Sequence, residues 1–108
     1  MKKDASATIR DAAMVVRSKN AGPFILTFDI LFKDKETFAR VQKAERLTRA
    51  AVAKAYNVSA NEILDFEFHA FANAVKFSIR RPIASGSVGD SDVYGSQQHA
   101  PLLALEAF

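Results

Sequence analysis

The chain has 108 residues, a common size for one domain, so residues 1–108 are expected to fold around one core. It has no cysteine, which excludes disulfide scaffolds, thiolate zinc sites and cysteine nucleophiles. The net charge of +3 comes from lysines and arginines interleaved with acids, as in Lys33-Asp34-Lys35-Glu36. That pattern indicates a solvated surface, and we expect no nucleic-acid partner.

Neither a secretory signal nor a membrane span is visible along the chain. Met1–Lys3 is basic, but Asp4-Ala5-Ser6 stands where an apolar segment would have to follow. No apolar run approaches the roughly 20 residues that cross a bilayer. The sequence therefore predicts a cytoplasmic protein without a membrane partner.

Apolar residues recur at helical spacing early in the chain. They are Ile9, Ala12, Ala13 and Val16, the stripe of an amphipathic helix. Thr8 is a suitable N-cap, and Gly22-Pro23 cannot continue a helix. We therefore predict a helix that ends near Asn20 and is followed by a turn.

The next segment, residues 24–32, alternates as a strand does. Phe24, Leu26, Phe28, Ile30 and Phe32 share one face, and the opposite face is apolar in part. The pattern predicts a central strand.

Two helices and two further strands are expected after it. Asp34 and Thr48 are suitable N-caps for the helices, and Asn57 is a reasonable end for the second. Leu64, Phe66 and Phe68 alternate with polar residues, as do Val75, Phe77 and Ile79. The short link between these strands favours an antiparallel hairpin. The predicted fold is α+β: a two-layer sandwich of a small, mostly antiparallel sheet with helices on one face, ferredoxin-like in style.

A polar segment, residues 82–101, precedes an apolar C-terminal run. It holds three of the four glycines, but Val88, Val93 and Tyr94 interrupt it. Because such anchors work against disorder, we predict an ordered polar loop.

Three groups of side chains are candidates for chemistry. His99 can act as a general base or form a structural hydrogen bond. Asp90 and Asp92 can help to hold a hard cation or can cap turns. Arg17 and Lys19 can bind a carboxylate or complement a helix dipole. Two histidines without cysteine argue against a self-contained zinc site, and the glycine-containing segment lacks the phosphate-binding and dinucleotide-binding motifs. The cofactor stays unknown, and a metal-dependent enzyme that acts alone is a further alternative.

Two long segments, Arg17–Phe32 and Ser85–Leu102, resemble a small family of unknown function whose members have about this length. That family is similar to the ferredoxin-fold C-terminal domain of AtuA-like (acyclic terpene utilisation) proteins. There an Arg-Ser-Gly-Asp-Lys-Gly motif opens the domain. Arg17 and Ser18 match it directly, and the positions after them depart from it.

The resemblance implies a small subunit that completes an AtuA-like large subunit. The pair would act on a small organic acid or its thioester as a lyase, namely a hydratase. The catalytic residues would be His99, Asp90 and Asp92. The substrate-binding residues would be Arg17, Ser18, Lys19, Asn20, Ser85, Ser87, Tyr94 and Gln97. The alternative is a non-catalytic homo-oligomer that binds an anion or another protein through the polar tail from Ser85 to His99.

Overall fold

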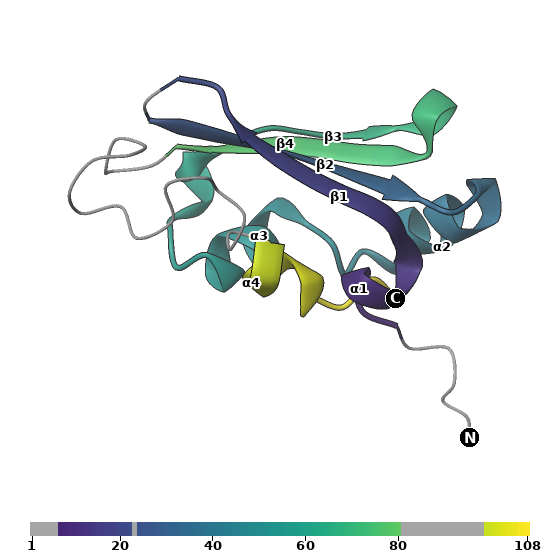
Figure 1. Cartoon of the computed structure of the whole chain (residues 1–108). Coiled ribbons are helices and arrows are strands. Elements are labelled where there is room, and N and C mark those ends of the chain that lie inside the picture. Colours follow the sequence, from purple (N-terminus) through teal and green to yellow (C-terminus); the bar gives the residue numbers. More distant parts are fainter. Residues whose placement is uncertain (1–6, 23, 81–98) are drawn as a thin grey trace.

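The computed structural model describes residues 7–22, 24–80 and 99–108. In chain order the elements are α1 (Ile9–Ala12), β1 (Ala13–Asn20), β2 (Ile25–Phe32), α2 (Lys35–Ala44), α3 (Arg49–Ala55), the 3-10 turn η1 (Ala60–Glu62), β3 (Ile63–His69), the 3-10 turn η2 (Ala70–Ala72), β4 (Ala74–Arg80) and α4 (His99–Leu103). The strands form one antiparallel sheet in the order β1-β2-β4-β3. The described α-helices α1–α4 all lie on one side of it (Figure 1). This is the expected α+β two-layer arrangement.

The core lies between the sheet and the helices. Phe28 of β2 and Phe77 of β4 are fully buried there, with stacked rings whose centroids are 5.0 Å apart. Ile30, Val75 and Val52 are buried as well. Burying side chains of this size contributes roughly 1.5–3 kcal/mol each, so this layer supplies much of the stability.

Strand β2 confirms the predicted alternation and the central position. Leu26, Phe28, Ile30 and Phe32 are buried, and β2 pairs with β1 on one side and β4 on the other. Phe24 is the exception, because it precedes the strand and is 49% exposed.

The predicted helix to Asn20 is wrong. Only Ile9–Ala12 is helical, with Thr8 as its cap, and Ala13–Asn20 forms the edge strand β1. Ile9 and Ala12 are buried and Val16 is half-buried, so the same apolar residues serve both structures. Pairing with β2 decides the outcome, because it satisfies backbone groups along the segment, and β-branched Val15 and Val16 suit a strand.

The two predicted helices, their caps and the hairpin are confirmed. Asp34 accepts a hydrogen bond from the Thr37 amide at 2.7 Å, and Thr48 accepts one from the Ala51 amide at 3.1 Å. Asn57, with φ of 58°, follows α3. Strands β3 and β4 pair through the turn η2.

Strand β3 departs from the predicted phase at its start. Asp65 has φ of 52°, and the register with β4 shifts between Leu64 and Glu67. Ile63 therefore faces the core opposite Ile79, whereas Leu64 lies opposite Ser78 on the other face. The inward prediction for Leu64 is wrong because a β-bulge inserts one residue and reverses the alternation.

The C-terminal segment returns to the start of the chain. The Ile9 amide donates to the Leu105 carbonyl at 2.8 Å, and the Ala107 amide donates to the Ala7 carbonyl at 2.7 Å. Of the predicted loop 82–101, residues 82–98 lie outside the described residues, and residues 99–101 belong to α4 instead. Leu102 in that helix is fully buried, and this burial explains why the segment packs as a helix. Among the described residues, no helix is long and apolar enough to cross a membrane.

Replacing Thr48 by Ala should lower the free energy of unfolding by about 1 kcal/mol, because the N-terminus of α3 loses its side-chain acceptor. Ser59→Ala is the matched control, since the Ser59 side chain makes no cap hydrogen bond to η1. Urea unfolding followed by circular dichroism measures both. Equal effects of the two substitutions would contradict the assigned cap.

Tyr56 should make stability sensitive to alkaline pH. Its ring packs against Phe28 at 5.5 Å, and burial raises the pKa of its hydroxyl despite a hydrogen bond with the Leu102 backbone. The unfolded chain therefore loses this proton first, so the contribution is complete below about pH 10 and decreases as the pH rises above that value. Unfolding of the wild type and Tyr56→Phe at a series of alkaline pH values measures the effect. The variant should lose less stability, and parallel curves would contradict the prediction.

Candidate functional site

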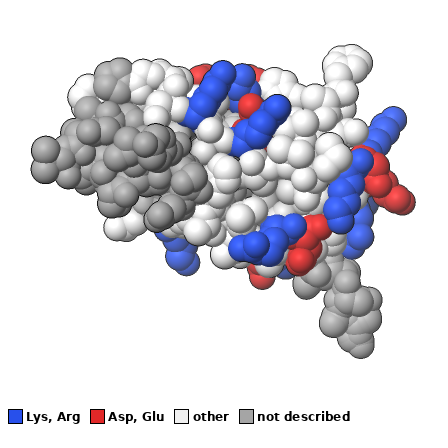
Figure 2. Space-filling view, in the orientation of Figure 1, with Lys and Arg blue, Asp and Glu red and all other residues white. Residues whose placement is uncertain are grey.

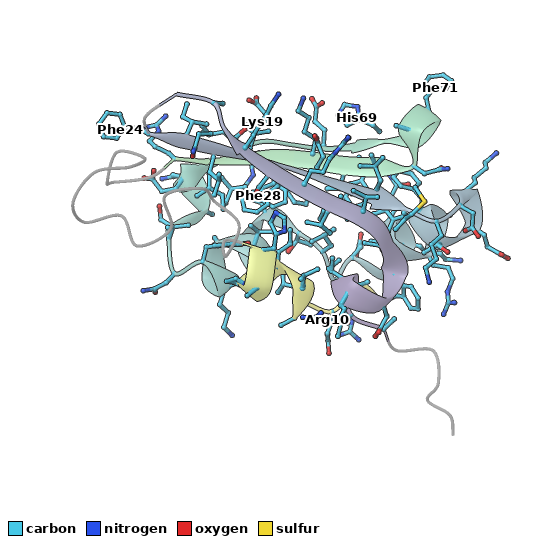
Figure 3. All side chains as sticks on the ribbon, in the orientation of Figure 1. Arg10, Lys19, Phe24, Phe28, His69 and Phe71 are labelled. Atoms are coloured by element: carbon cyan, nitrogen blue, oxygen red, sulfur yellow. The ribbon has the colours of Figure 1, made fainter. Side chains whose placement is uncertain are left out.

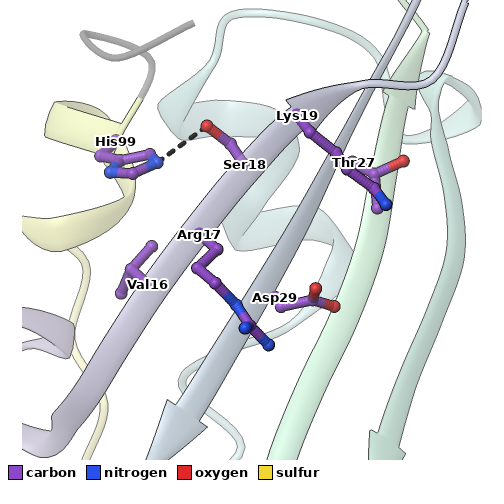
Figure 4. Close-up of a pocket in the computed structure, with 7 residues that line it drawn as sticks. All are labelled: Val16, Arg17, Ser18, Lys19, Thr27, Asp29 and His99. Carbon is purple, nitrogen blue, oxygen red and sulfur yellow. Dashed lines mark hydrogen bonds between the residues drawn. The ribbon is translucent and has the colours of Figure 1, made fainter.

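A pocket of about 600 Å³ lies along the edge strand β1 (Figure 4). The described residues that line it are Val16, Arg17, Ser18, Lys19, Thr27, Asp29 and His99. Strand β1 supplies four of them, β2 supplies two, and the first residue of α4 supplies the last. The pocket therefore joins two segments that are about 80 residues apart in the sequence.

Ser18 and His99 make the direct contact between these segments. Ser18 Oγ lies 2.8 Å from His99 Nε2, on the side of β1 that faces the helices (Figure 4). The His99 ring also lies against Phe28, with centroids 6.2 Å apart. When Nε2 is unprotonated the hydroxyl donates to it, and when Nε2 carries a proton the ring donates to the hydroxyl. Either way Ser18 fixes the orientation of the imidazole.

Arg17 and Lys19 lie on the opposite face of the sheet. Side chains of a strand alternate between faces, so the two cations flank Ser18 in sequence but project away from the helices. Arg17 pairs in register with Asp29, and Lys19 pairs with Thr27. In the predicted helix terminus and turn these side chains would have had no such alternation. The pocket consequently has a histidine side and a cationic side, separated by the edge strand.

The two cations differ in their electrostatic surroundings. The register neighbour of Arg17 is the carboxylate of Asp29, which offsets its charge locally. The register neighbour of Lys19 is a hydroxyl residue, Thr27, whose Oγ lies 3.0 Å from Ser78 Oγ. A carboxylate that approaches Lys19 therefore meets a cation and hydroxyl groups. Lys19 is the better anion ligand of the two.

The structure brings together four of the predicted site residues: Arg17, Ser18, Lys19 and His99. Asn20 is not among the described residues that line the pocket, although it continues the same strand. The other predicted residues lie outside the described part of the chain. They are Ser85, Ser87, Asp90, Asp92, Tyr94 and Gln97.

The sequence interpretation missed Thr27, Asp29 and Val16. Thr27 and Asp29 are the only polar residues within β2, an otherwise apolar strand. That interruption is a signal for a functional face. If residues 17–20 formed a helix, Thr27 and Asp29 would have no cationic neighbours on an adjacent strand. Strand pairing is what places Lys19 beside Thr27.

The arrangement can bind an anion and move a proton. A histidine can act as an acid or a base, and a cation at Lys19 attracts carboxylates. Within residues 7–22, 24–80 and 99–108, no three or more His, Asp or Glu side chains are grouped so that they could hold a metal ion.

The Ser18–His99 hydrogen bond should be measurable as a coupling energy. We expect Ser18→Ala and His99→Ala to couple by about 1 kcal/mol in a double-mutant cycle of unfolding free energies. A cycle of Ser59→Ala with His99→Ala is the control and should be additive within about 0.5 kcal/mol. Additivity in the first cycle would show that the contact contributes nothing.

Comparison with known proteins identifies a family. A family model described as a domain of unknown function (DUF4387) matches residues 9–106. No curated protein and no solved structure matches the chain. The matched region contains β1, β2 and α4, and with them every described residue of the pocket. The chain therefore belongs to the DUF4387 family.

Proposed function

We propose that this chain is the small subunit of a two-component enzyme that acts on a small organic acid or its thioester. The observation that carries the proposal is the Ser18–His99 contact at 2.8 Å in a pocket that also contains Lys19. The pocket thus holds a residue that can move a proton, His99, and a residue that can bind a carboxylate, Lys19, on the two sides of the edge strand β1. Proton removal next to a carbonyl is a step common to hydratases, and a lyase of that type is our assignment.

Each pocket residue has a role in this proposal. Lys19, with Thr27 beside it, binds the carboxylate on the open side of the sheet. His99 transfers the proton, and Ser18 positions its ring. Arg17 adds positive potential, reduced by Asp29. The proposed contributions of Asp90 and Asp92 fall outside the described residues.

The proposed partner is an AtuA-like large subunit. The match of Arg17-Ser18 to the first two residues of the opening motif of the AtuA-like C-terminal domain supports it, whereas the positions after them depart from that motif. The described residues of the pocket supply one histidine, two cations and the carboxylate of Asp29, and in this proposal a second subunit contributes the remaining catalytic groups. Such a division of groups explains why neither candidate segment forms a complete catalytic motif.

A second candidate function is a non-catalytic homo-oligomer that binds an anion or another protein. The observation that favours it is the face of the sheet opposite the helices, which no described helix covers (Figure 1). In this alternative His99→Ala weakens assembly or stability and leaves the turnover of any partner enzyme unchanged.

Binding of a small hydroxy acid tests the role of Lys19. Lactate is the probe, and perturbation of amide signals in nuclear magnetic resonance spectra gives the dissociation constant. Lys19→Ala should weaken binding about tenfold, since a charge-assisted hydrogen bond contributes roughly 1.5–3 kcal/mol and this site is open to solvent. Arg17→Ala should weaken it less, because Asp29 offsets its charge.

Lys43→Ala, an exposed change on α2, is the matched control and should leave lactate binding unchanged. The same variants are then co-expressed with an AtuA-like large protein and assayed for complex formation and turnover. The subunit assignment requires a stable complex in which His99→Ala abolishes activity. An AtuA-like protein that neither binds the chain nor gains activity from it would refute that assignment.

A further inference from the structure

None of the described helices covers the face of the sheet opposite α1–α4, which we call the open face. Lys19, His69 and Phe71 lie on that side, whereas Phe28 lies between the sheet and the helices (Figure 3). Phe71 in η2 is fully exposed, with a relative accessibility of 108%, and Val15 on β1 is 37% exposed. Exposed apolar side chains on an uncovered sheet indicate a surface that another molecule covers.

A row of alternating charge crosses this face. Arg17 of β1 lies beside Asp29 of β2, Asp29 lies beside Lys76 of β4, and Lys76 lies beside Glu67 of β3. From one edge of the sheet to the other, the signs are therefore plus, minus, plus, minus. Figure 2 shows basic and acidic side chains close together along the upper rim of the molecule, where the open face lies.

This row of charges is complementary to the same row read from the opposite edge of the sheet. If a second copy is turned about a two-fold axis parallel to the strands, its β3 lies over β1 and its β4 lies over β2. Arg17 then meets the partner subunit's Glu67, and Asp29 meets the partner subunit's Lys76. A two-fold axis between the sheets that ran perpendicular to the strands would instead place each charged residue against the same residue of the partner subunit, which is repulsive. The row thus selects one of these two ways of stacking the sheets.

The apolar side chains of the open face agree with the same axis. The next row along the strands is Val15, Leu31, Ala74 and His69, and η2 with Phe71 stands at the His69 end. The same two-fold rotation places Phe71 near the partner subunit's Val15 and Leu31. A hollow of about 600 Å³ on this face is lined in part by Leu31, Ala74 and Phe71. Charge and apolar shape therefore lead to the same arrangement.

We propose that two copies of this chain pack sheet to sheet through the open face, about a two-fold axis parallel to the strands. Sheets stacked in this way lie about 10 Å apart with strands within about 30° of each other, so the side chains of both faces interdigitate. This dimer does not require the proposed enzymatic role, although it covers part of the face from which Lys19 projects. The pocket along β1 would border the interface, because Arg17 and Asp29 contribute to both.

Mixing two charge-reversal variants tests the arrangement. The dimer contains two Arg17–Glu67 contacts, so Arg17→Glu alone creates two Glu–Glu contacts, and Glu67→Arg alone creates two Arg–Arg contacts. Each variant should sediment as a monomer of 11.9 kDa, while the wild type sediments as a dimer. An equimolar mixture restores both contacts, one reversed and one native, and should form a heterodimer.

The mixing experiment distinguishes contacts between two chains from charge pairing within one chain. Arg17 and Glu67 lie on opposite edges of the sheet, so neither can repair the other inside a monomer. Lys43→Glu and Glu36→Arg on α2 are matched controls and should leave the dimer intact. A wild type that is monomeric at every concentration tested, a dimer that survives either reversal, or a mixture that stays monomeric would each overturn the proposal.

Phe71→Ala gives an independent measure of the apolar part. Because Phe71 is fully exposed within one chain, the thermal stability of the monomeric Arg17→Glu background should not change when Phe71→Ala is added. In the wild-type background the same change should raise the dimer dissociation constant at least tenfold, since burial of a phenylalanine contributes roughly 1.5–3 kcal/mol. An unchanged dissociation constant would contradict the stated axis.

Discussion

The pairing of β1 with β2 is the interaction on which the rest of this structure depends. It converts residues 13–20 into an edge strand and assigns alternate side chains to opposite faces of the sheet. Ser18 thereby reaches His99 in the helical layer, and Lys19 projects to the open side beside Thr27. If the same residues formed a helix, the sheet would begin at β2, and neither the pocket nor the charged row would exist.

The edge position of β1 also explains how one short segment can serve two surfaces. A central strand has a neighbouring strand on each side, so a pocket beside it cannot reach from one face of the sheet to the other. At an edge only one strand divides the helical layer from the open face, and a pocket can include side chains from both. The family match over residues 9–106 includes this whole arrangement, so the pocket belongs to the region that defines the family.

The proposed enzymatic role and the proposed dimer use different properties of the chain. The first relies on the chemistry of His99 and Lys19 at the β1 edge. The second relies on the order of charges across four strands and on the exposure of Phe71. A stacked pair of sheets leaves the helical layer and His99 accessible to another subunit, but the same rotation places the partner subunit's Leu64 over Lys19, so a carboxylate would have to reach Lys19 from the β1 edge. Two small subunits joined in this way would present two copies of the pocket.

The sequence by itself determined the α+β composition, the central strand β2, the capped helices α2 and α3, and the β3–β4 hairpin. These features depend on local alternation, on side-chain caps such as Thr48, and on short links between elements. Each of these signals involves only residues that are close together in the sequence. The sequence also indicated Ser18 and His99 as site residues. Only the tertiary structure decided that residues 13–20 form a strand, that a bulge at Asp65 reverses the start of β3, and that His99 begins a helix. The physical reason is that apolar spacing at Ile9, Ala12 and Val16 satisfies a helix and a strand alike, so hydrogen bonding to a distant partner makes the choice.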